Sequence, residues 1–335
     1  MDLKDLLSKN KVLVIGDVIL DNYIYGKVHR ISPEAPVPVV LKNKSNYCLG
    51  GSANVAQNVS SFGSTCYLIG VCGDDQSANT LSNLMEEKNI IPSLIKDPSR
   101  PTTEKTRIIG NNHQIARIDS ESTLAVSADV QAEIISEFLN VIDDVDGVVI
   151  QDYGKGMLTE TLLSKIFHEC KERNIPTITD PKERDFTKYA GSSWIKPNLT
   201  EFKNALDVPL TSDLKLSEIE SKASSMLNTF GFDGVLLTMS EMGMLLKTSN
   251  YMESVDGIKI EVTDVSGAGD TVSAVFILSL LSGVSLKDCL RISNLSGSIV
   301  CQISGAVPVD PNILLNSIAS NGWSIMCDSG NLISV

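Results

Sequence analysis

Short apolar runs rich in β-branched residues alternate with longer segments of helical composition along this 335-residue chain, and this alternation limits the possible folds most. The predicted strands cover residues 11–15, 66–71, 147–150, 176–179 and 234–239. The predicted helices cover residues 52–61, 77–88, 131–142, 160–173, 216–229, 268–281 and 287–302. Strands joined by helices of this length form βαβ crossovers, which place a parallel sheet between two layers of helices. The sequence therefore predicts a doubly wound α/β fold with a mostly parallel sheet.

Two segments do not fit this alternation, at about residues 22–42 and 102–119. Both combine proline or β-branched residues with polar ones, which favours extended strands in a small sheet separate from the central one. Ligands of open α/β sheets bind beyond the carboxyl ends of the strands, where such a small sheet can exclude water. We expect one domain over residues 1–335 with a small β-sheet lid.

Composition excludes several classes of function. The chain has 28 basic and 41 acidic residues, a net charge of −13, whereas nucleic-acid binding needs Lys and Arg to neutralise phosphates. No apolar stretch approaches the roughly 18 residues of a membrane-spanning helix, and no signal core opens the sequence. Seven scattered cysteines without a C-x-x-C pair argue against disulfides and zinc. We expect a cytoplasmic protein that binds neither nucleic acid nor membrane.

The segment DVSGAGDT, residues 264–271, directly precedes an apolar predicted helix. Its small residues Gly267, Ala268 and Gly269 allow backbone N–H groups to converge on an anion at the positive end of the helix. Asp270 could accept a proton from an attacking hydroxyl. The alternative is a glycine-rich turn in which Asp270 caps the helix.

Three further clusters carry polar groups at predicted strand ends or helix starts. Gly51 and Asn54 begin the helix at 52–61, where they form either a tight turn or a site for sugar hydroxyls. Asp21 and Asp152 follow the first and third predicted strands, and each serves either a ligand hydroxyl or a turn. Asn198 and Glu201 are spaced either for metal-bound phosphates or for a capping box.

Motifs of other enzyme classes are missing from the sequence. It contains no G-x-x-x-x-G-K-[ST] loop, no G-x-G-x-x-G after a strand and no G-x-S-x-G elbow. The sequence therefore lacks the usual signatures of P-loop and dinucleotide-binding proteins. An NAD-dependent oxidoreductase, which would share the βαβ pattern, remains the alternative enzyme class, and a catalytically silent sugar- or nucleotide-binding regulator remains the non-enzymatic one.

The two glycine clusters, in this order and spacing, resemble the two signatures of the ribokinase-like (PfkB) carbohydrate kinases over residues 11–308. Within that family, residues 16–26, 30–40 and 152–156 resemble the kinases of D-glycero-β-D-manno-heptose 7-phosphate. The resemblance implies ATP- and Mg²⁺-dependent phosphorylation of the anomeric hydroxyl to the 1,7-bisphosphate, in ADP-heptose and lipopolysaccharide core synthesis. A kinase for ribose, fructose or a hexose phosphate is the alternative within the family.

The resemblance also implies a role for each candidate residue. Asp270 would be the catalytic base and residues 267–269 the anion hole; ATP and its Mg²⁺ would contact Asn198, Glu201, Ser240 and Gly243, with Glu201 acting on the metal indirectly through the phosphates. The sugar would contact Asp21, Gly51, Asn54 and Asp152, and its phosphate would be held among Lys155, Lys182, Arg107 and Arg117. A homodimer is implied as well. Only about 25 residues follow Pro311, so we expect no C-terminal nucleotidyltransferase domain.

Overall fold

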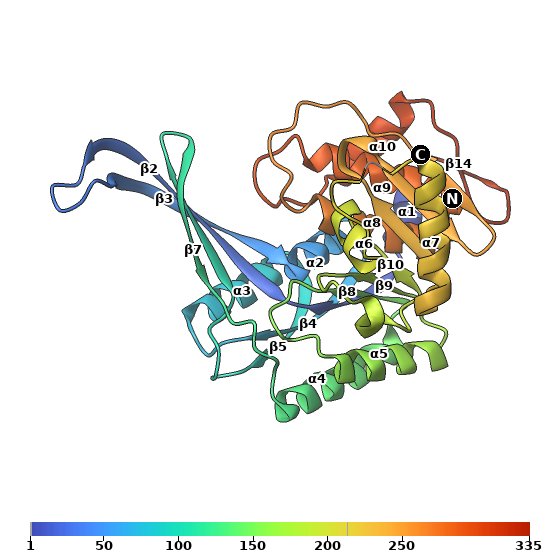
Figure 1. Cartoon of the computed structure of the whole chain (residues 1–335), viewed down its shortest axis with the longest axis horizontal. Helices are drawn as coiled ribbons and strands as arrows, with labels where there is room; N and C mark the ends of the chain where they lie inside the picture. The colour runs from blue at the N-terminus through green and yellow to red at the C-terminus, as the bar shows by residue number, and fades with distance from the viewer. Residues whose placement is uncertain (1, 213) are drawn as a thin grey trace.

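The computed structural model describes residues 2–212 and 214–335, which form an α/β fold around a nine-stranded sheet (Figure 1). Adjacent strands lie in the order β13-β12-β11-β10-β9-β8-β1-β4-β5, and all neighbours from β11 to β5 are parallel. The bounds are β1 Lys11–Gly16, β4 Thr65–Cys72, β5 Ile90–Lys96, β8 Gly147–Gln151, β9 Thr177–Asp180, β10 Trp194–Ile195, β11 Gly234–Thr238, β12 Met244–Thr248 and β13 Met252–Val255. The predicted mostly parallel sheet is confirmed.

Helices cover both faces of this sheet, because its central strands are apolar on both sides. In β1, Val12 and Val14 belong to one buried cluster, whereas Leu13 and Ile15 belong to the other. The first face carries α1 Leu3–Leu7, α2 Ser52–Ser61, α3 Gln76–Glu87, α8 Ala268–Leu281, α9 Leu286–Val300 and α10 Pro311–Ser320. The second face carries α4 Ala128–Val141, α5 Glu160–Glu172, α6 Leu199–Ala205 and α7 Leu216–Phe230.

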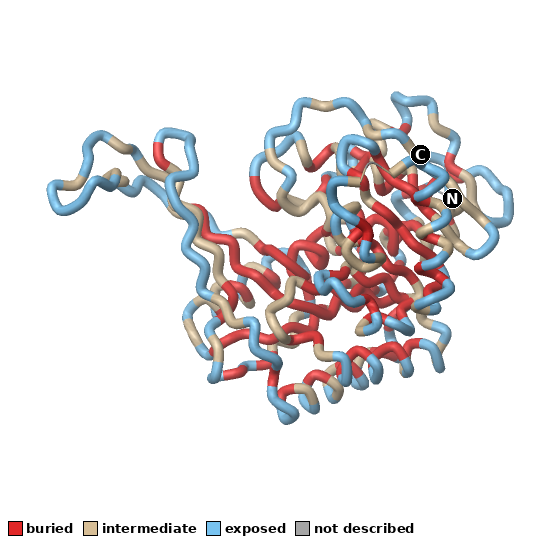
Figure 2. The backbone as a smooth tube through the Cα atoms, viewed as in Figure 1, coloured by how far each residue is buried: buried red, intermediate tan, exposed pale blue. Residues whose placement is uncertain are grey.

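A separate four-stranded sheet, here called the lid sheet, projects from the body (Figure 1). Its order is β3-β2-β6-β7, with bounds β2 Val18–Ile31, β3 Pro38–Gly51, β6 Glu104–Gly110 and β7 His113–Ser120. The predicted small sheet is confirmed, but its first segment is longer than 22–42, because β2 and β3 stay paired from Val18 and Gly51 outward. Figure 2 shows that the base of the lid sheet is buried and its far end exposed.

The alternation missed strands that no helix separates from their neighbours. β12 and β13 follow β11 as antiparallel neighbours, with only the short turn η3 (Ser240–Met242) between β11 and β12. β5 contains Pro92, which is tolerated because β5 is an edge strand. Elements also missed are α1, α6, α10, β10, β14 Ile325–Met326, β15 Leu332–Ile333, η1 Ile142–Asp144 and η2 Phe186–Tyr189. In the described ranges, no helix is long and apolar enough to cross a membrane.

The carboxyl ends of the parallel strands lie close to the base of the lid sheet. The backbone N–H of Asp17, directly after β1, donates to Gln151 at the end of β8, and the N–H of Asp152 donates to Asp180 at the end of β9. Helices α2 and α8 pack together on one face of these strands. Side chains that follow three strands and open two helices are therefore brought into one region.

Candidate active site

The N-terminus of α8 is shaped for a close approach. Its N-cap is Gly267, with φ at 80°, and a Cβ built at this position would lie 2.4 Å from Nδ2 of Asn54. A side chain here would therefore be strained and would also displace the Asn54 amide. The first N–H groups of a helix have no acceptor within the helix, so this end of α8 can provide donors where the sequence predicted an anion hole, although the N–H of Ala268 donates to the Val265 carbonyl at 3.3 Å.

Asp270 is buried in the first turn of α8, with 3% of its surface exposed. Its Oδ1 accepts hydrogen bonds from the Tyr153 hydroxyl at 2.7 Å and from the Gln151 amide at 3.0 Å. Its Oδ2 accepts a hydrogen bond from the Asn54 amide at 2.7 Å. The alternative that Asp270 caps α8 is wrong, because Gly267 occupies the N-cap and the carboxylate turns away from the helix toward β8 and α2.

The surroundings of Asp270 suit a proton acceptor. Burial, with Asp180 adding to it, raises the pKa of Asp270 from 3.8 to about 7, although the hydrogen bonds from Asn54 and Tyr153 and the charge of Lys196 oppose the shift. A general base works best when its pKa lies near the pH at which it operates. The structure thus supplies a carboxylate that can both hold and release a proton near neutral pH.

Of the predicted sugar contacts Asn54 and Gly51, Asn54 binds this carboxylate, and Gly51 precedes the same helix as its N-cap. Asn54 is fully buried, and its Oδ1 accepts a hydrogen bond from Gln57 at 2.7 Å, which fixes the amide with its N–H groups toward Asp270. Gly51 ends β3 with φ at 59°, and a Cβ there would lie 2.4 Å from the carbonyl oxygen of Asp17. The glycine is therefore required for the turn from the lid sheet into α2.

The two predicted sugar carboxylates have different surroundings. Asp21 does not follow the first strand as expected but lies within β2, where it forms a partly buried ion pair with Arg107 of β6. Asp152 follows β8 as expected and is buried. Its carboxylate accepts hydrogen bonds from Lys188 Nζ at 2.7 Å, the Tyr189 hydroxyl at 2.8 Å and the backbone N–H of Gly154 at 2.7 Å.

Basic side chains gather on one face of the lid sheet. Lys105 and Arg107 are two residues apart on β6, so they share a face, and Arg117 lies opposite Arg107 on β7. Lys105 Nζ lies 5.9 Å from the centre of the Tyr153 ring, which shows that this face looks toward Asp270. Burial, and then the neighbouring charge of Lys155, lowers the pKa of Lys105. The structure thus brings Lys105 and Lys155 together beside Tyr153, whereas Arg107 lies over the ring of Tyr23.

The pairing of these cations differs. Lys155 binds Glu121 at 2.7 Å, and the more exposed Arg117 binds Asp119 at 2.9 Å. Within the described part of the chain, Lys105 forms no ion pair. Lys182 is exposed and lies close enough to Glu201 to lower the pKa of that carboxyl. It also lies beside the loop that carries Tyr153, because a Cβ built at Gly154 would be 3.5 Å from its Cγ.

Asn198 and Glu201 form the capping box that the sequence left as an alternative. Each backbone N–H donates to the other side chain at 2.9 Å, at the start of the seven-residue α6. Burial, with Asp180 adding to it, raises the pKa of Glu201. Ser240 and Gly243 lie at η3, next along the same sheet edge after β11.

The acidic side chains near the start of α6 suit one kind of Mg²⁺ site. Among residues 2–212 and 214–335, no group of three or more His, Cys, Asp or Glu side chains could hold a metal by itself. Mg²⁺ in kinases is held by one or two carboxylates together with the phosphates of the nucleotide and water. Glu201 and Asp180 lie close enough for the charge of one to raise the pKa of the other, so they fit this second type of site.

Comparison with known proteins agrees with this geometry. A family model described as "pfkB family carbohydrate kinase" matches residues 9–312. The chain belongs to the pfkB family of carbohydrate kinases. This kinase is 40% identical to the bifunctional protein HldE of Helicobacter pylori strain P12, over 87% of this chain and 62% of that protein. It is 34% identical to the bifunctional protein HldE of Coxiella burnetii, over 98% of this chain and 69% of that protein. The chain spans about three fifths of the length of the first curated relatives it matches.

Solved structures show the same fold. Phosphofructokinase-2 of Escherichia coli superimposes with a TM-score of 0.77 at 16% identity, over 94% of this kinase and all of that chain. Ribokinase of Thermotoga maritima superimposes with a TM-score of 0.70 at 20% identity, over 92% and 99% of the two chains. The predicted ribokinase-like fold is confirmed.

Sequence reasoning missed several residues that touch the site of this kinase. Gln151 and Tyr153 flank the predicted Asp152 and contact Asp270, which Asp152 does not. Lys196 is buried after β10, where it binds Asp180 at 2.9 Å, and a Cβ built at Gly269 would lie 3.4 Å from its Nζ. Gln151 ends β8 and Tyr153 lies two residues beyond it, so applying the strand-end rule to every residue type would have found both. Lys196 follows the two-residue β10, which was not predicted, so this rule would not have found it.

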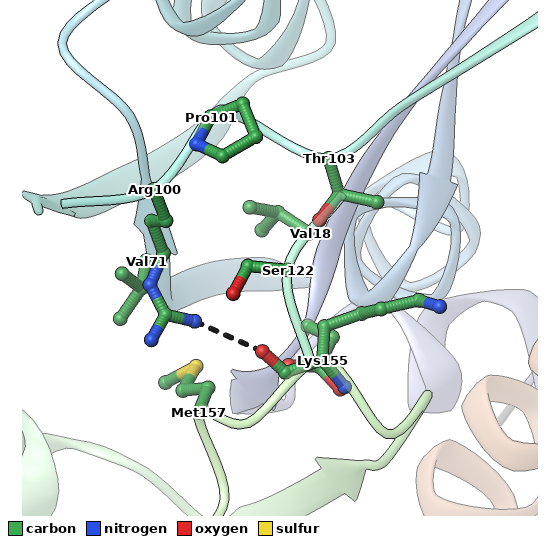
Figure 3. Close-up of a pocket in the computed structure, with 9 residues that line it drawn as sticks. Val18, Val71, Arg100, Pro101, Thr103, Ser122, Lys155 and Met157 are labelled. Carbon is green, nitrogen blue, oxygen red and sulfur yellow. Dashed lines mark hydrogen bonds between the residues drawn. The ribbon is translucent and has the colours of Figure 1, made fainter. Parts of the chain in front are cut away.

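The side chain of Asp17 holds the backbone of the loop that carries Tyr153. Asp17 accepts hydrogen bonds from the backbone N–H groups of Tyr153 at 2.8 Å and Lys155 at 3.0 Å. Figure 3 shows the cavity beside it, where Arg100 donates to the Lys155 carbonyl at 2.9 Å and the Lys155 side chain points away. Burial, and then the charge of Asp152, raises the pKa of Asp17 to about 6.

Proposed function

We propose that this kinase transfers the γ-phosphoryl group of ATP to the anomeric hydroxyl of D-glycero-D-manno-heptose 7-phosphate. The observation that supports the proposal is the position of Lys105, 5.9 Å from the ring centre of Tyr153, whose hydroxyl donates to Asp270, with the charge of Lys155 beside it. A sugar bound between Lys105 and Asp270 would place a hydroxyl at the carboxylate and a remote phosphate at the cations. The similarity to bifunctional HldE proteins supports the same branch of the family.

Charge explains why such a cluster is needed. The net charge of −13 repels anionic substrates at long range. A sugar phosphate is therefore held only by cations inside the screening distance of about 8 Å at physiological salt. Lys105 forms no ion pair within the described part of the chain, so it is free to bind a phosphate, whereas Arg107 and Lys155 each have a carboxylate partner. Arg107 and Lys155 would complete the contact by charge-assisted hydrogen bonds.

The reaction uses groups already placed around α8. Asp270 accepts the proton of the acceptor hydroxyl as its oxygen attacks the γ-phosphorus in line with the leaving ADP oxygen. The N–H groups at residues 267–269 stabilise the charge on the transferring phosphoryl oxygens. Lys196, beside Gly269, adds a positive charge at the same place. The lid sheet covers the sugar and limits the access of water.

The nucleotide would extend from α8 toward η3. Asn198 and Glu201 would orient the metal-bound phosphates, and Ser240 and Gly243 would lie along the nucleotide. Bound Mg²⁺ would supply charge neutralisation on the β- and γ-phosphates. The carboxylates of Glu201 and Asp180 are the groups of this chain that would hold it.

The lid sheet also supports the proposal of a homodimer. Its outer part exposes large apolar side chains, and an exposed strand edge invites pairing with another chain. The exposed side chains are Ile31, Leu41, Ile115 and Ile118. Sedimentation of the purified kinase tests this, and a monomer at micromolar concentration would contradict it.

An ADP-release assay over a panel of acceptors tests the substrate. The remote phosphate contributes binding energy that orients the acceptor hydroxyl, so its loss should lower kcat as well as raise KM. We expect kcat/KM to fall from heptose 7-phosphate to hexose 6-phosphates and then to free sugars. If free ribose or fructose equals or exceeds heptose 7-phosphate, the heptose assignment is wrong and another sugar kinase activity takes its place.

A further inference from the structure

Three side chains donate hydrogen bonds to Asp270, and they differ in exposure. Asn54 is fully buried and Gln151 is 1% exposed, so both belong to the interior. Tyr153 is only partly buried. Asp270 itself is 3% exposed, so an acceptor hydroxyl cannot reach it while all three donors stay in place. Tyr153 is the donor on the open side.

Tyr153 also lies between the carboxylate and the lid sheet. Its hydroxyl donates to Asp270 at 2.7 Å, and Lys105 Nζ of β6 lies 5.9 Å from its ring centre. Its backbone is held by Asp17 at 2.8 Å, and the next turn of the loop is held by Asp17 through the N–H of Lys155. A movement of Tyr153 must therefore come from its side chain, by rotation of the ring about χ1.

We propose that Tyr153 is a gate whose hydroxyl occupies, on Asp270, the place that the acceptor hydroxyl takes during the reaction. A phenol O–H and a sugar O–H are the same kind of donor, so the exchange leaves the carboxylate with the same number of hydrogen bonds. An acceptor whose phosphate draws Lys105 off the ring would release the gate at the same time. The inference rests on the proposed role of Asp270 as the base.

The gate has a consequence when no sugar is bound. The Tyr153 hydroxyl keeps water away from the Asp270 carboxylate. Without the hydroxyl, the carboxylate could activate a water molecule to attack ATP. The competing hydrogen bond also makes acceptor binding weaker than it would be with a free carboxylate. Both effects belong to the hydroxyl or ring of Tyr153 and not to the fold as a whole.

Steady-state kinetics of Tyr153→Phe at pH 8.5 test the gate, with the acceptor that the wild type uses best. Phe fills the same space without the hydroxyl, so we expect acceptor KM to fall about three- to tenfold, with kcat within about twofold. Tyr251→Phe is the matched control, because Tyr251 donates to Glu253 at 3.2 Å on β13, at the far edge of the sheet. We expect its KM and kcat to be unchanged.

The pH profile gives a second readout that a packing role would not move. The groups that act on Asp270 are Gln151 at the end of β8, Tyr153 after it, Asn54 of α2, Asp180 of β9 and Lys196 after β10. Removing the Tyr153 donor destabilises the ionised carboxylate, so the acid limb of kcat/KM should move to higher pH. Tyr153→Ala, which also opens space, should increase ATP hydrolysis without sugar.

Two results would overturn the gate. A fall in kcat at unchanged acceptor KM would show that Tyr153 stays on Asp270 and orients it throughout the reaction. An unchanged KM, kcat and pH profile would show that the hydroxyl plays no part. Asp270→Asn separates these outcomes from failure of the proposed function, because full activity in that variant would show that Asp270 is not the base.

Discussion

Asp270→Asn should make this kinase inactive and, at alkaline pH, more stable. The substitution removes the proposed base while preserving the volume of the side chain. Loss of a positioned general base lowers kcat by about 10²- to 10⁴-fold. Affinity for ATP should stay nearly the same, because no nucleotide contact is removed.

The gain in stability follows from the buried charge. The pKa of Asp270 is about 7 in the folded kinase and 3.8 as its ordinary value. The folded state therefore holds a proton more tightly, and the stability of the wild type falls as pH rises from about 4 to about 7. About three pH units at 1.36 kcal/mol each give a cost of about 4 kcal/mol at pH 8. At pH 5 the same relation gives about 1.6 kcal/mol.

The Asn variant has no buried charge and so avoids this cost, but its side-chain NH₂ group cannot accept a hydrogen bond from the three donors. The Asn54 amide cannot simply rotate, because its Oδ1 accepts from Gln57 at 2.7 Å. One unsatisfied donor costs about 1–3 kcal/mol. The variant should therefore be about 1–3 kcal/mol more stable than the wild type at pH 8, and about equal or slightly less stable at pH 5.

Thermal unfolding at both pH values provides the measurement. For 335 residues, an unfolding entropy of about 0.7 kcal/mol/K converts 1 kcal/mol into about 1.4 °C. The difference in Tm between variant and wild type should thus be about 3–4 °C larger at pH 8 than at pH 5. A difference that does not change with pH would refute the raised pKa. Turnover like the wild type in the folded variant would refute the base.

Three further predictions concern the same site. In the wild type, kcat/KM should rise with pH through a limb near 7 as Asp270 ionises, and a limb near 4 would contradict the burial argument. Glu201→Gln should raise the Mg²⁺ concentration for half-maximal rate while leaving acceptor KM unchanged. A lower Tm without a change in this Mg²⁺ concentration would mean that Glu201 serves only to cap α6. Lys105→Met should raise KM for sugar phosphates about tenfold or more but not for free sugars, whereas Lys44→Met, a lid-sheet lysine 4.8 Å from the Tyr25 ring centre, should change neither. Equal effects of Lys105→Met on both kinds of sugar would remove it from the phosphate site.

Local pattern was sufficient for five of the parallel strands of the central sheet, β1, β4, β8, β9 and β11, and for the two helices that open the site. The predicted bounds of α2 and α8 agree with the structure at both ends, because Gly51 and Gly267 mark their starts and the following residues favour helix. Strands such as β1 were predictable because both of their faces are buried, which demands a continuous apolar run. The lid sheet was predictable as a departure from this pattern, although its true extent was not.

Contacts between distant segments decided the rest. Asp270 and Asn54 are 216 residues apart in the chain, and Asp270 and Tyr153 are 117 apart, so no local pattern shows that they share a hydrogen bond. The same holds for Lys105, whose importance depends on which face of β6 turns toward Tyr153. The sequence by itself determined which residues could accept a proton or bind an anion. Only the packing of β8, α2 and α8 decided which carboxylate is buried among three donors, because desolvation depends on every neighbour that surrounds a charge in space.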